Sequence, residues 1–419
     1  MSQGALWSIV GTVGSRIFTL VSWFAVARFV GKEDFGRIGV IQSTVGLFGV
    51  FAGFGLGAAG VKYVAEYKNN DPIRAGRVVG GALLLAAFVS ISCTTVLVLS
   101  APYLAEHLLA DSSLKLLLYW SSPLVFLGAV SGVLSGAMMG LGAFRGLAVV
   151  MVVATAIGAL VTVAMSFVFG LVGCIASMSV STLLQCVILA FSLRKEASGW
   201  GISVSYKMST RELSSLGLFS VPAMLSSLTV IPVNWICNSM LVGSPGGYAE
   251  MGVFNAANQW RTSVLFIPNA ISTVALPFFA EYSGERGSKF NGIIVFNIVV
   301  NFGVAVIAIV PIVLLADSIM ACYGKGFENG ASTLIVLVFS AAFMAVNAVL
   351  GSALVGRGRI WIGVFCNVIW AMVLLGVGNI WIHQEGAYGL ARAILISYPV
   401  QTICLIMGLV RIRQSPPKG

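Results

Sequence analysis

The chain has 419 residues, of which 58% are hydrophobic and only 9% are charged, and its formal net charge is +10. A soluble globular domain carries about 25% charged residues, so this composition excludes a soluble enzyme, a nucleic-acid-binding module and a protein with a single membrane anchor. At ~20 residues per membrane-spanning helix, a chain of this length holds roughly a dozen helices with short loops. We therefore predict an all-α polytopic membrane protein.

Apolar runs separated by charged or turn-forming residues predict twelve spanning helices. In chain order they cover residues 6–30, 37–61, 77–101, 114–140, 147–168, 171–193, 213–240, 249–279, 290–316, 331–355, 360–382 and 387–410. Only Phe169–Gly170 separates the fifth helix from the sixth. The longest segment between helices, 194–212, is too short for a folded catalytic or nucleotide-binding domain. We expect two six-helix lobes, residues 1–203 and 204–419.

Lysine and arginine are distributed very unequally between alternate loops. Sixteen of them lie on one side of the predicted membrane: Lys62, Lys68, Arg74, Arg77, Arg145, Arg194, Lys195, Lys207, Arg211, Arg286, Lys289, Arg357, Arg359, Arg411, Arg413 and Lys418. Four lie on the other side: Lys32, Arg37, Lys115 and Lys325. Because cytoplasmic loops are enriched in Lys and Arg, we predict that both termini are cytoplasmic.

Three short matches relate the two halves of the chain. FGRIGVIQS (35–43) matches YAEMGVFNA (248–256), AEY recurs at 65–67 and 280–282, and LGAFR (141–145) matches VGRGR (355–359). The three matches agree on one interval, close to half the length of the chain. With an even number of helices in each half, the halves are related by an axis along the membrane normal, a layout known in transporters that bind their substrate near the midplane.

The charges inside the apolar runs are all arginines. All 14 carboxylates lie in loops or at helix ends, whereas four arginines lie within apolar runs: Arg16, Arg28, Arg261 and Arg392. A charged side chain at the bilayer centre costs about 2.5–3.5 kcal/mol on insertion scales, and no acid in the same runs offsets that cost. We therefore predict a water-filled cationic cavity that receives an anionic ligand. Arg16 and Arg261 are the most central of the four, while Arg28 and Arg392 lie nearer the non-cytoplasmic ends, where they can extend to the interface.

Amide side chains form the second candidate set. Asn255, Asn258 and Gln259 cluster around Arg261, and further amides within the runs include Gln42, Asn234, Asn238, Asn297, Asn301, Asn347, Asn367 and Gln401. Guanidinium groups bind two phosphate oxygens at once, and amides suit sugar hydroxyls, although hydrogen bonding between helices is their alternative use. The predicted substrate-binding residues are Arg16, Arg28, Arg261, Arg392, Asn255, Asn258 and Gln259.

Other sequence patterns point to packing instead of chemistry. Glycines spaced four residues apart, Gly49/Gly53, Gly76/Gly80 and Gly132/Gly136/Gly140, predict close contacts between helices. The sequence contains no Walker loop and no HExxH, GxSxG or CxxC motif. We therefore predict a protein that is not an enzyme and has no catalytic residues, no cofactor and no metal site.

The stretch ARFVGKEDFGRIGVIQSTVGLFGVFAGFGLGAAGVKYVAEY (27–67) resembles the first helical hairpin of Wzx-type polysaccharide flippases, members of the multidrug/oligosaccharidyl-lipid/polysaccharide exporter superfamily. The resemblance implies a flippase that moves undecaprenyl-diphosphate-linked oligosaccharide, such as an O-antigen unit for lipopolysaccharide biosynthesis, across the bacterial inner membrane. Arg16 and Arg261 would hold the diphosphate during alternating access between the lobes. The implied partners are the lipid-linked oligosaccharide, membrane lipid and other polysaccharide-assembly membrane proteins, with no nucleic acid.

Three alternatives remain at the level of sequence. A multidrug or small-molecule antiporter usually needs a membrane carboxylate, and none lies within the apolar runs. A major-facilitator carrier usually has a GxxxDRxGR-like loop after its second helix, where this chain has KYVAEYKNNDPIRAGR (62–77). A membrane glycosyltransferase or ligase is expected to have large periplasmic loops or acids at the membrane edge.

Overall fold

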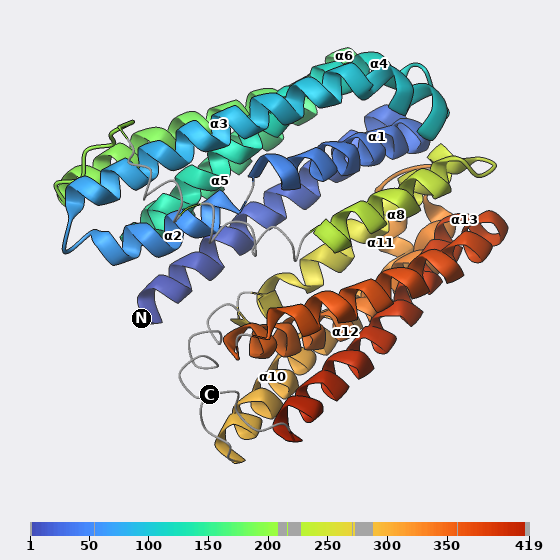
Figure 1. The fold of residues 1–419 in the computed structure, drawn as a ribbon. Coiled ribbons are helices and arrows are strands. Elements are labelled where there is room, and N and C mark those ends of the chain that lie inside the picture. Colours follow the sequence, from blue (N-terminus) through green and yellow to red (C-terminus); the bar gives the residue numbers. More distant parts are fainter. Residues whose placement is uncertain are drawn as a thin grey trace. The chain divides into compact units, whose positions relative to one another are not determined.

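A computed structural model describes residues 2–53, 55–207, 216, 228–269, 271–272, 288–357 and 359–414, with the backbone alone for 2–10, 12, 288–290 and 412–414. Its regular elements are helices, arranged in two compact units, Met1–Trp235 and Ile236–Gly419 (Figure 1). The boundary between the units falls within the helix Leu228–Val242. The lobe boundary that we predict from the sequence, at 203/204, lies earlier in the chain.

In the N-terminal unit, long helices lie side by side (Figure 1). In chain order they are α1 (Ser2–Gly53), α2 (Leu56–Tyr67), α3 (Pro72–Tyr103), a π-helical turn (Leu104–Leu108), α4 (Leu114–Ser121), α5 (Pro123–Leu141) and α6 (Phe144–Gly199). The C-terminal unit contains α8 (Gly247–Val264), α10 (Ser288–Leu314), α11 (Ala316–Cys322), a 3-10 turn (Glu328–Gly330), α12 (Ala331–Gly356) and α13 (Ile360–Gln414).

Three of these helices are each long enough for two membrane crossings, and each breaks at a glycine. The breaks are at Gly31 in α1 (φ 81°, ψ 174°), Gly170 in α6 (φ 57°, ψ −135°) and Gly386 in α13 (φ 57°, ψ −128°). Glycine adopts positive φ without steric cost because it has no Cβ. The breaks fall where the sequence predicts the boundaries 30/37, 168/171 and 382/387.

The described helices cover parts of all twelve predicted spans. Seven helices are long and apolar enough to span a membrane, and three of them are the double-length helices. With Leu228–Val242 and α8, the described ranges contain parts of all twelve predicted spans. Most of 213–227 and all of 273–279, at the ends of two predicted spans, lie outside the described residues.

The sequence repeat has a counterpart in the backbone. Gly31 and Gly246, separated by about the interval of the sequence matches, both have positive φ, 81° and 68°. Gly170 and Gly386, separated by nearly the same interval, share their unusual φ and ψ. The turns at Gly170 and Gly386 each also need a second glycine, three residues later. A Cβ at Gly173 would lie 2.1 Å from the Met165 carbonyl oxygen, and one at Gly389 would lie 2.0 Å from that of Trp381. The AEY match at 280–282 lies outside the described residues.

Glycine pairs have different roles in the N-terminal unit. A Cβ at Gly136 would lie 2.2 Å from the Gly57 carbonyl oxygen, so α5 and α2 do pack backbone to backbone as the sequence predicts. Among the described residues, nothing lies within 4 Å of a Cβ at Gly49 or Gly53, so the close contact predicted there is not seen in that part of the chain.

Gly76 and Gly80 contact an extended segment instead of a helix. A Cβ at these positions would lie 2.0 Å from the Ser203 carbonyl oxygen and 2.2 Å from that of Ser205, and the Ser205 N–H donates to the Gly76 carbonyl at 3.2 Å. The prediction of helix packing at this pair is therefore wrong. The missing Cβ of a glycine lets another backbone come close, but it does not specify whether that backbone belongs to a helix or to an extended segment. The segment after α6 is held on α3 in this way.

Each unit has an apolar core of its own. In the N-terminal unit the core includes Leu134 of α5 and Leu189 of α6, and in the C-terminal unit it includes Leu350 of α12 and Leu405 of α13. Many large apolar side chains elsewhere are exposed, such as Leu99 (76%), Leu160 (73%) and Leu314 (78%). Extensive exposed apolar surface suits contact with lipid and not with water.

Candidate substrate-binding site

Helix α8 is the polar helix of the C-terminal unit. It begins after Gly246, which has a positive φ of 68°. Its first turn carries Glu250, whose negative charge interacts favourably with the positive end of the helix dipole. It has the length of a short spanning helix but is not among the seven that are apolar enough to cross a membrane alone. Helices α12 and α13 pack against it. A polar helix that is packed inside a helical unit is a candidate for lining a binding site.

Arg261 is the most deeply placed charge on α8. It is 7% exposed, and it is the one charged residue among the described side chains that is fully buried. Its Nε and Nη1 have no hydrogen-bond acceptor among the described residues. Tyr398 of α13, which is also buried, is near enough to interact with it electrostatically. Leaving charged donors buried without acceptors is costly, so Arg261 stays a predicted binding residue for an anion.

Two neighbouring amides of α8 also have unused hydrogen-bonding atoms. Asn255 Nδ2 and Asn258 Oδ1 are buried without a partner among the described residues. Asn258 lies one helical turn before Arg261, so that the two share a face of α8. Gln259 is half-buried, and its backbone carbonyl accepts hydrogen bonds from Thr262 and Ser263. Helix α8 therefore offers cationic donors, an amide donor and an amide acceptor close together in sequence.

Other predicted amides are used within the protein. Asn347 of α12 donates to Gln401 at 2.9 Å, and Gln401 donates to Asn367 at 2.7 Å, which joins α12 to both halves of α13. Thr402 donates to Asn347 Oδ1 at 2.7 Å. Three more amides donate to the carbonyl four residues earlier in their own helix: Asn234, Asn297 and Asn301. The alternative interpretation, hydrogen bonding that stabilises helices, describes these bonds, although Asn301 Oδ1 is itself buried without a partner among the described residues.

Arg392 has an acidic partner, so the prediction that no acid compensates it is wrong. Its Nη1 donates to both oxygens of Glu385, at 2.7 and 2.9 Å. The two residues lie on opposite sides of the Gly386 break in α13, and the reversal of the chain there brings them together. The pair neutralises Arg392, which is therefore a weaker candidate for binding an anion than Arg261.

The other two predicted arginines belong to the N-terminal unit. Arg16 is half-buried and Arg28 is exposed, and both lie in the first half of α1. Their separation in the sequence corresponds to about 18 Å along a helix axis. The structure thus places Arg261, Asn255, Asn258 and Gln259 together on α8, and it does not bring Arg16 and Arg28 to one point.

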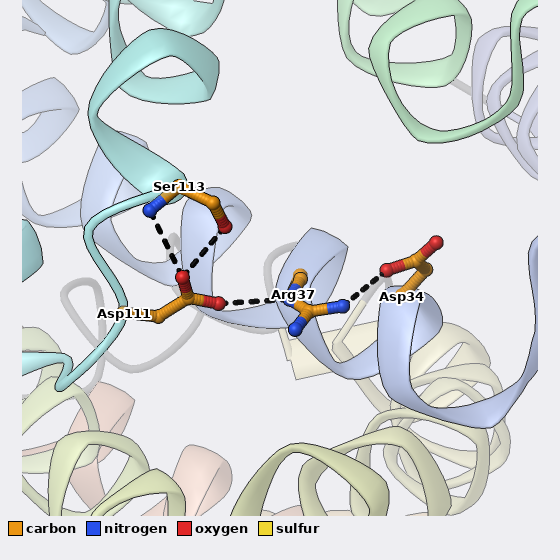
Figure 2. Close-up of polar contacts among 4 residues, drawn as sticks. All are labelled: Asp34, Arg37, Asp111 and Ser113. Atoms are coloured by element: carbon orange, nitrogen blue, oxygen red, sulfur yellow. Dashed lines mark hydrogen bonds and ion pairs between the residues drawn. The ribbon is translucent and has the colours of Figure 1, made fainter.

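An ionic cluster that we did not predict lies in the N-terminal unit (Figure 2). Arg37 of α1 donates through Nε to Asp111 at 2.9 Å and through Nη1 to Asp34 at 2.5 Å. Asp111 also accepts from the N–H and hydroxyl of Ser113, at 2.9 and 2.6 Å. Burial alone would raise the pKa of Asp111, but these hydrogen bonds and the charge of Arg37 together hold it below its usual value. The cluster ties the second half of α1 to the loop before α4.

The repeat relates Arg37 to Glu250, since both are the third residue of the matched segments 35–43 and 248–256. Glu250 accepts a hydrogen bond from the Ala387 N–H at 2.9 Å and so holds the first turn of α8 beside the Gly386 break. Equivalent positions in the two halves thus anchor a helix to a turn, with charges of opposite sign. A charged residue at both repeat positions was the signal that could have revealed this role.

Comparisons with known proteins agree with the helical architecture. A family model described as polysaccharide biosynthesis protein matches residues 1–283. The EPS I polysaccharide export inner membrane protein EpsE of Ralstonia nicotianae is 24% identical over 228 residues, 53% of this chain and 49% of that protein. The lipid III flippase of Escherichia coli K12 is 24% identical over 291 residues, 68% of each chain. The chain thus matches about half the length of the first relative.

Solved structures have the same fold at low sequence identity. A multidrug resistance MATE family transporter of the MOP superfamily aligns in its inward-facing conformation with a TM-score of 0.79 and in its outward-facing conformation with 0.75, both at 17% identity. These alignments cover 97% and 98% of this chain, and 98% and 95% of the transporter.

A MOP superfamily transporter from Pyrococcus furiosus, described as having a binding pocket of reverse polarity, aligns with a TM-score of 0.74 at 17% identity, over 97% of this chain and 94% of that one. The fold is therefore that of these transporters. Because the family model covers about two-thirds of the sequence, the chain belongs to the polysaccharide biosynthesis protein family.

Proposed function

We propose that this protein is a flippase that translocates a lipid-linked oligosaccharide with an anionic linker across the bacterial inner membrane. Support comes from the family and from relatives whose names describe polysaccharide export and lipid III flipping. The resemblance of residues 27–67 to Wzx-type flippases supports undecaprenyl diphosphate as the linker and an O-antigen-like unit as the cargo. The distribution of lysine and arginine supports cytoplasmic termini.

The observation that carries the proposal is the buried guanidinium of Arg261. Two of its nitrogens have no acceptor among the described residues, and the planar guanidinium group matches the oxygens of a diphosphate. Asn255 and Asn258 add a donor and an acceptor for phosphate oxygens or the first sugar. Arg16 stays a predicted second cation, in the N-terminal unit.

The mechanism we propose is alternating access, with the charged linker and sugars passing through the protein while the polyprenyl chain stays in lipid. Related transporters have been solved facing inward and facing outward, and the chain aligns with both states. Arg261 then lowers the cost of moving the diphosphate through a medium of low dielectric constant, because it supplies an opposite charge there.

A multidrug antiporter is the alternative function, because the solved structures with this fold include multidrug resistance transporters. Such a protein usually needs a buried carboxylate for a proton or cation, yet the buried charged residue among the described side chains is an arginine. An anionic substrate fits this polarity better than a cationic drug. A glycosyltransferase or ligase has no comparable support, because the relatives are exporters and flippases by name.

The test is made in cells that depend on this protein for surface polysaccharide. Arg261→Ala should abolish surface polysaccharide and leave complete lipid-linked units on the cytoplasmic face, with a normal level of the protein in the membrane. Arg261→Lys should restore little, because an ammonium cannot bind two oxygens in one plane. Arg194→Ala, at an exposed arginine, is the matched control and should behave as the wild type. Normal surface polysaccharide in Arg261→Ala cells would refute the proposal.

A further inference from the structure

Four side chains around the Gly386 break form a group that the mechanism above does not use. Arg392 and Glu385 make their two-oxygen ion pair there, and the guanidinium carbon of Arg392 lies 4.3 Å from the ring centroid of Trp381 and 5.8 Å from that of Tyr388. We call Trp381, Glu385, Tyr388 and Arg392 the Gly386 cluster. It combines two aromatic rings with a fixed set of donors and acceptors.

The Gly386 cluster is accessible and has no net charge. The side chains of Arg392 and Glu385 are 37% and 32% exposed, and Tyr388 is 36% exposed. Glu385 occupies Nη1 of Arg392, and the other guanidinium nitrogens have no partner among the described residues. A surface of this kind does not attract a phosphate, but it can hydrogen-bond to a neutral polar ligand that also has an apolar face.

The internal repeat provides a comparison within the chain. The turn at Gly170 has nearly the same φ and ψ as the turn at Gly386, and each is completed by a second glycine, Gly173 or Gly389. When the two turns are aligned on Gly170 and Gly386, the first half has apolar side chains at the four cluster positions: Met165, Phe169, Val172 and Ala176. The fold therefore makes this turn without any polar group, so the Gly386 cluster is not needed to form it.

The position of the Gly386 cluster relates it to Arg261. Glu250 holds the first turn of α8 beside Ala387, and both α8 and the second half of α13 run away from that point. Arg261 lies about 16 Å beyond Glu250 along its helix, whereas Arg392 lies about 8 Å beyond Ala387 along its own. Along these two helices the Gly386 cluster is thus nearer to the turn than Arg261 is.

We propose that the Gly386 cluster binds a neutral sugar of the transported oligosaccharide, a role that rests on the proposed function. The C–H face of a pyranose ring would stack on Trp381 or Tyr388. Its hydroxyl groups would donate to the carboxylate of Glu385 and accept from the remaining N–H groups of Arg392. Recognition of cargo would then be divided between a charged contact at Arg261 and a neutral contact near the turn.

The experiment measures two ligands on the purified full chain in lipid nanodiscs. One probe is the oligosaccharide released by mild acid from the cell's own lipid-linked pool, which carries no phosphate, and the other is inorganic pyrophosphate. Trp381→Ala should weaken the binding of the oligosaccharide about tenfold, through loss of one aromatic contact, and leave the Kd for pyrophosphate unchanged. Trp381→Phe keeps a ring and should lose less. Phe169→Ala, at the equivalent position of Glu385 in the other turn, is the matched control and should change neither ligand.

The variant Arg261→Ala distinguishes a failure of the proposed function from a failure of the sugar-binding proposal. It should weaken pyrophosphate and leave the released oligosaccharide unchanged, and a failure of that arm alone counts against the proposed function and not against the Gly386 cluster. The sugar proposal is overturned if the wild-type chain does not bind the oligosaccharide, or if Trp381→Ala and Trp381→Phe, with wild-type melting temperatures, bind it as tightly as the wild type. Should Trp381→Ala fail to fold, Trp381→Phe and Tyr388→Ala decide the question by the same criterion.

Discussion

Substitution of Gly386 by alanine should destabilise the C-terminal unit through two separable effects. The first is backbone strain, because φ 57° with ψ −128° is a conformation that side chains with a Cβ rarely adopt; such strain costs about 1–3 kcal/mol. The second is steric, because the new Cβ would lie 2.6 Å from Glu250 Oε2. Glu250 must move, and its 2.9 Å hydrogen bond to the Ala387 N–H is lost.

The size of each effect can be estimated from the structure. Gly170→Ala isolates the strain, because its φ and ψ are almost the same as those of Gly386 and no described residue lies within 4 Å of its Cβ. With strain near 2 kcal/mol, and roughly 2–4 °C per kcal/mol for a unit of this size, Gly170→Ala should lower the melting temperature by about 4–8 °C. The lost bond adds about 1.5 kcal/mol, the low end for a charged acceptor because Glu250 is half-buried. Gly386→Ala should therefore lose roughly a further 3–6 °C.

The assay is thermal unfolding in detergent, followed by intrinsic fluorescence, for a double-mutant cycle of Gly386→Ala and Glu250→Ala. In the Glu250→Ala background, Gly386→Ala should cost only what Gly170→Ala costs. Equal losses for Gly386→Ala with and without Glu250 would refute the reasoning, since the clash with Glu250 would then have no energetic consequence.

Two further predictions concern the N-terminal unit. Because the pKa of Asp111 is held below its usual value of about 3.9, its contribution to stability is present above that pH and is lost as the pH falls through the lower, folded-state pKa. Melting temperatures measured from pH 7 to pH 3 should fall less steeply in Asp111→Asn, which already lacks this contribution at pH 7, and equal slopes would contradict the assignment. Gly136→Ala should cost about 1–3 kcal/mol of unfolding free energy, because its Cβ would lie 2.2 Å from the Gly57 carbonyl oxygen. Gly128→Ala on the same helix, whose Cβ would have no described residue within 4 Å, is the control. Equal melting temperatures for the two variants would show that α2 and α5 do not pack as described.

The helices and their breaks could be predicted from the sequence because membrane spans have a strong local signal. An apolar run of about 20 residues must satisfy its own backbone hydrogen bonds in lipid and so becomes helical. Gly170 and Gly386 then appear as interruptions in otherwise continuous runs. The repeat could be read for the same reason, since its matches lie at the starts and ends of such runs.

Contacts between side chains that the fold brings together were not predictable, because the local composition of the sequence does not specify them. Arg392 and Glu385 meet only because the chain reverses at Gly386, and Arg37 and Asp111 are 74 residues apart. The amides were equally ambiguous. Asn347 and Asn258 both lie in apolar runs, yet Asn347 is bonded to Gln401 and Asn258 Oδ1 has no partner among the described residues.

The binding role of Arg261 stays a prediction. The sequence selects Arg261 because it is a charge in the middle of an apolar run, and the structure places it in the interior, where two of its nitrogens have no acceptor among the described residues. The glycine patterns show the opposite case. Gly76 and Gly80 have the spacing of a helix contact, but an extended segment at Ser203 and Ser205 occupies the space, because the absence of a Cβ does not specify which backbone approaches.

The role of Arg261 is tested most directly by translocation in a defined membrane. The full chain is reconstituted into liposomes with lipid-linked oligosaccharide, and the fraction of sugar that reaches the opposite leaflet is followed with a membrane-impermeant label. We expect transfer by the wild-type chain and a rate lower by more than about thirtyfold in Arg261→Ala, because removing one partner of a buried charge pair costs ~2–5 kcal/mol. Transfer at the wild-type rate by Arg261→Ala would contradict the central claim that a buried guanidinium carries the anionic linker.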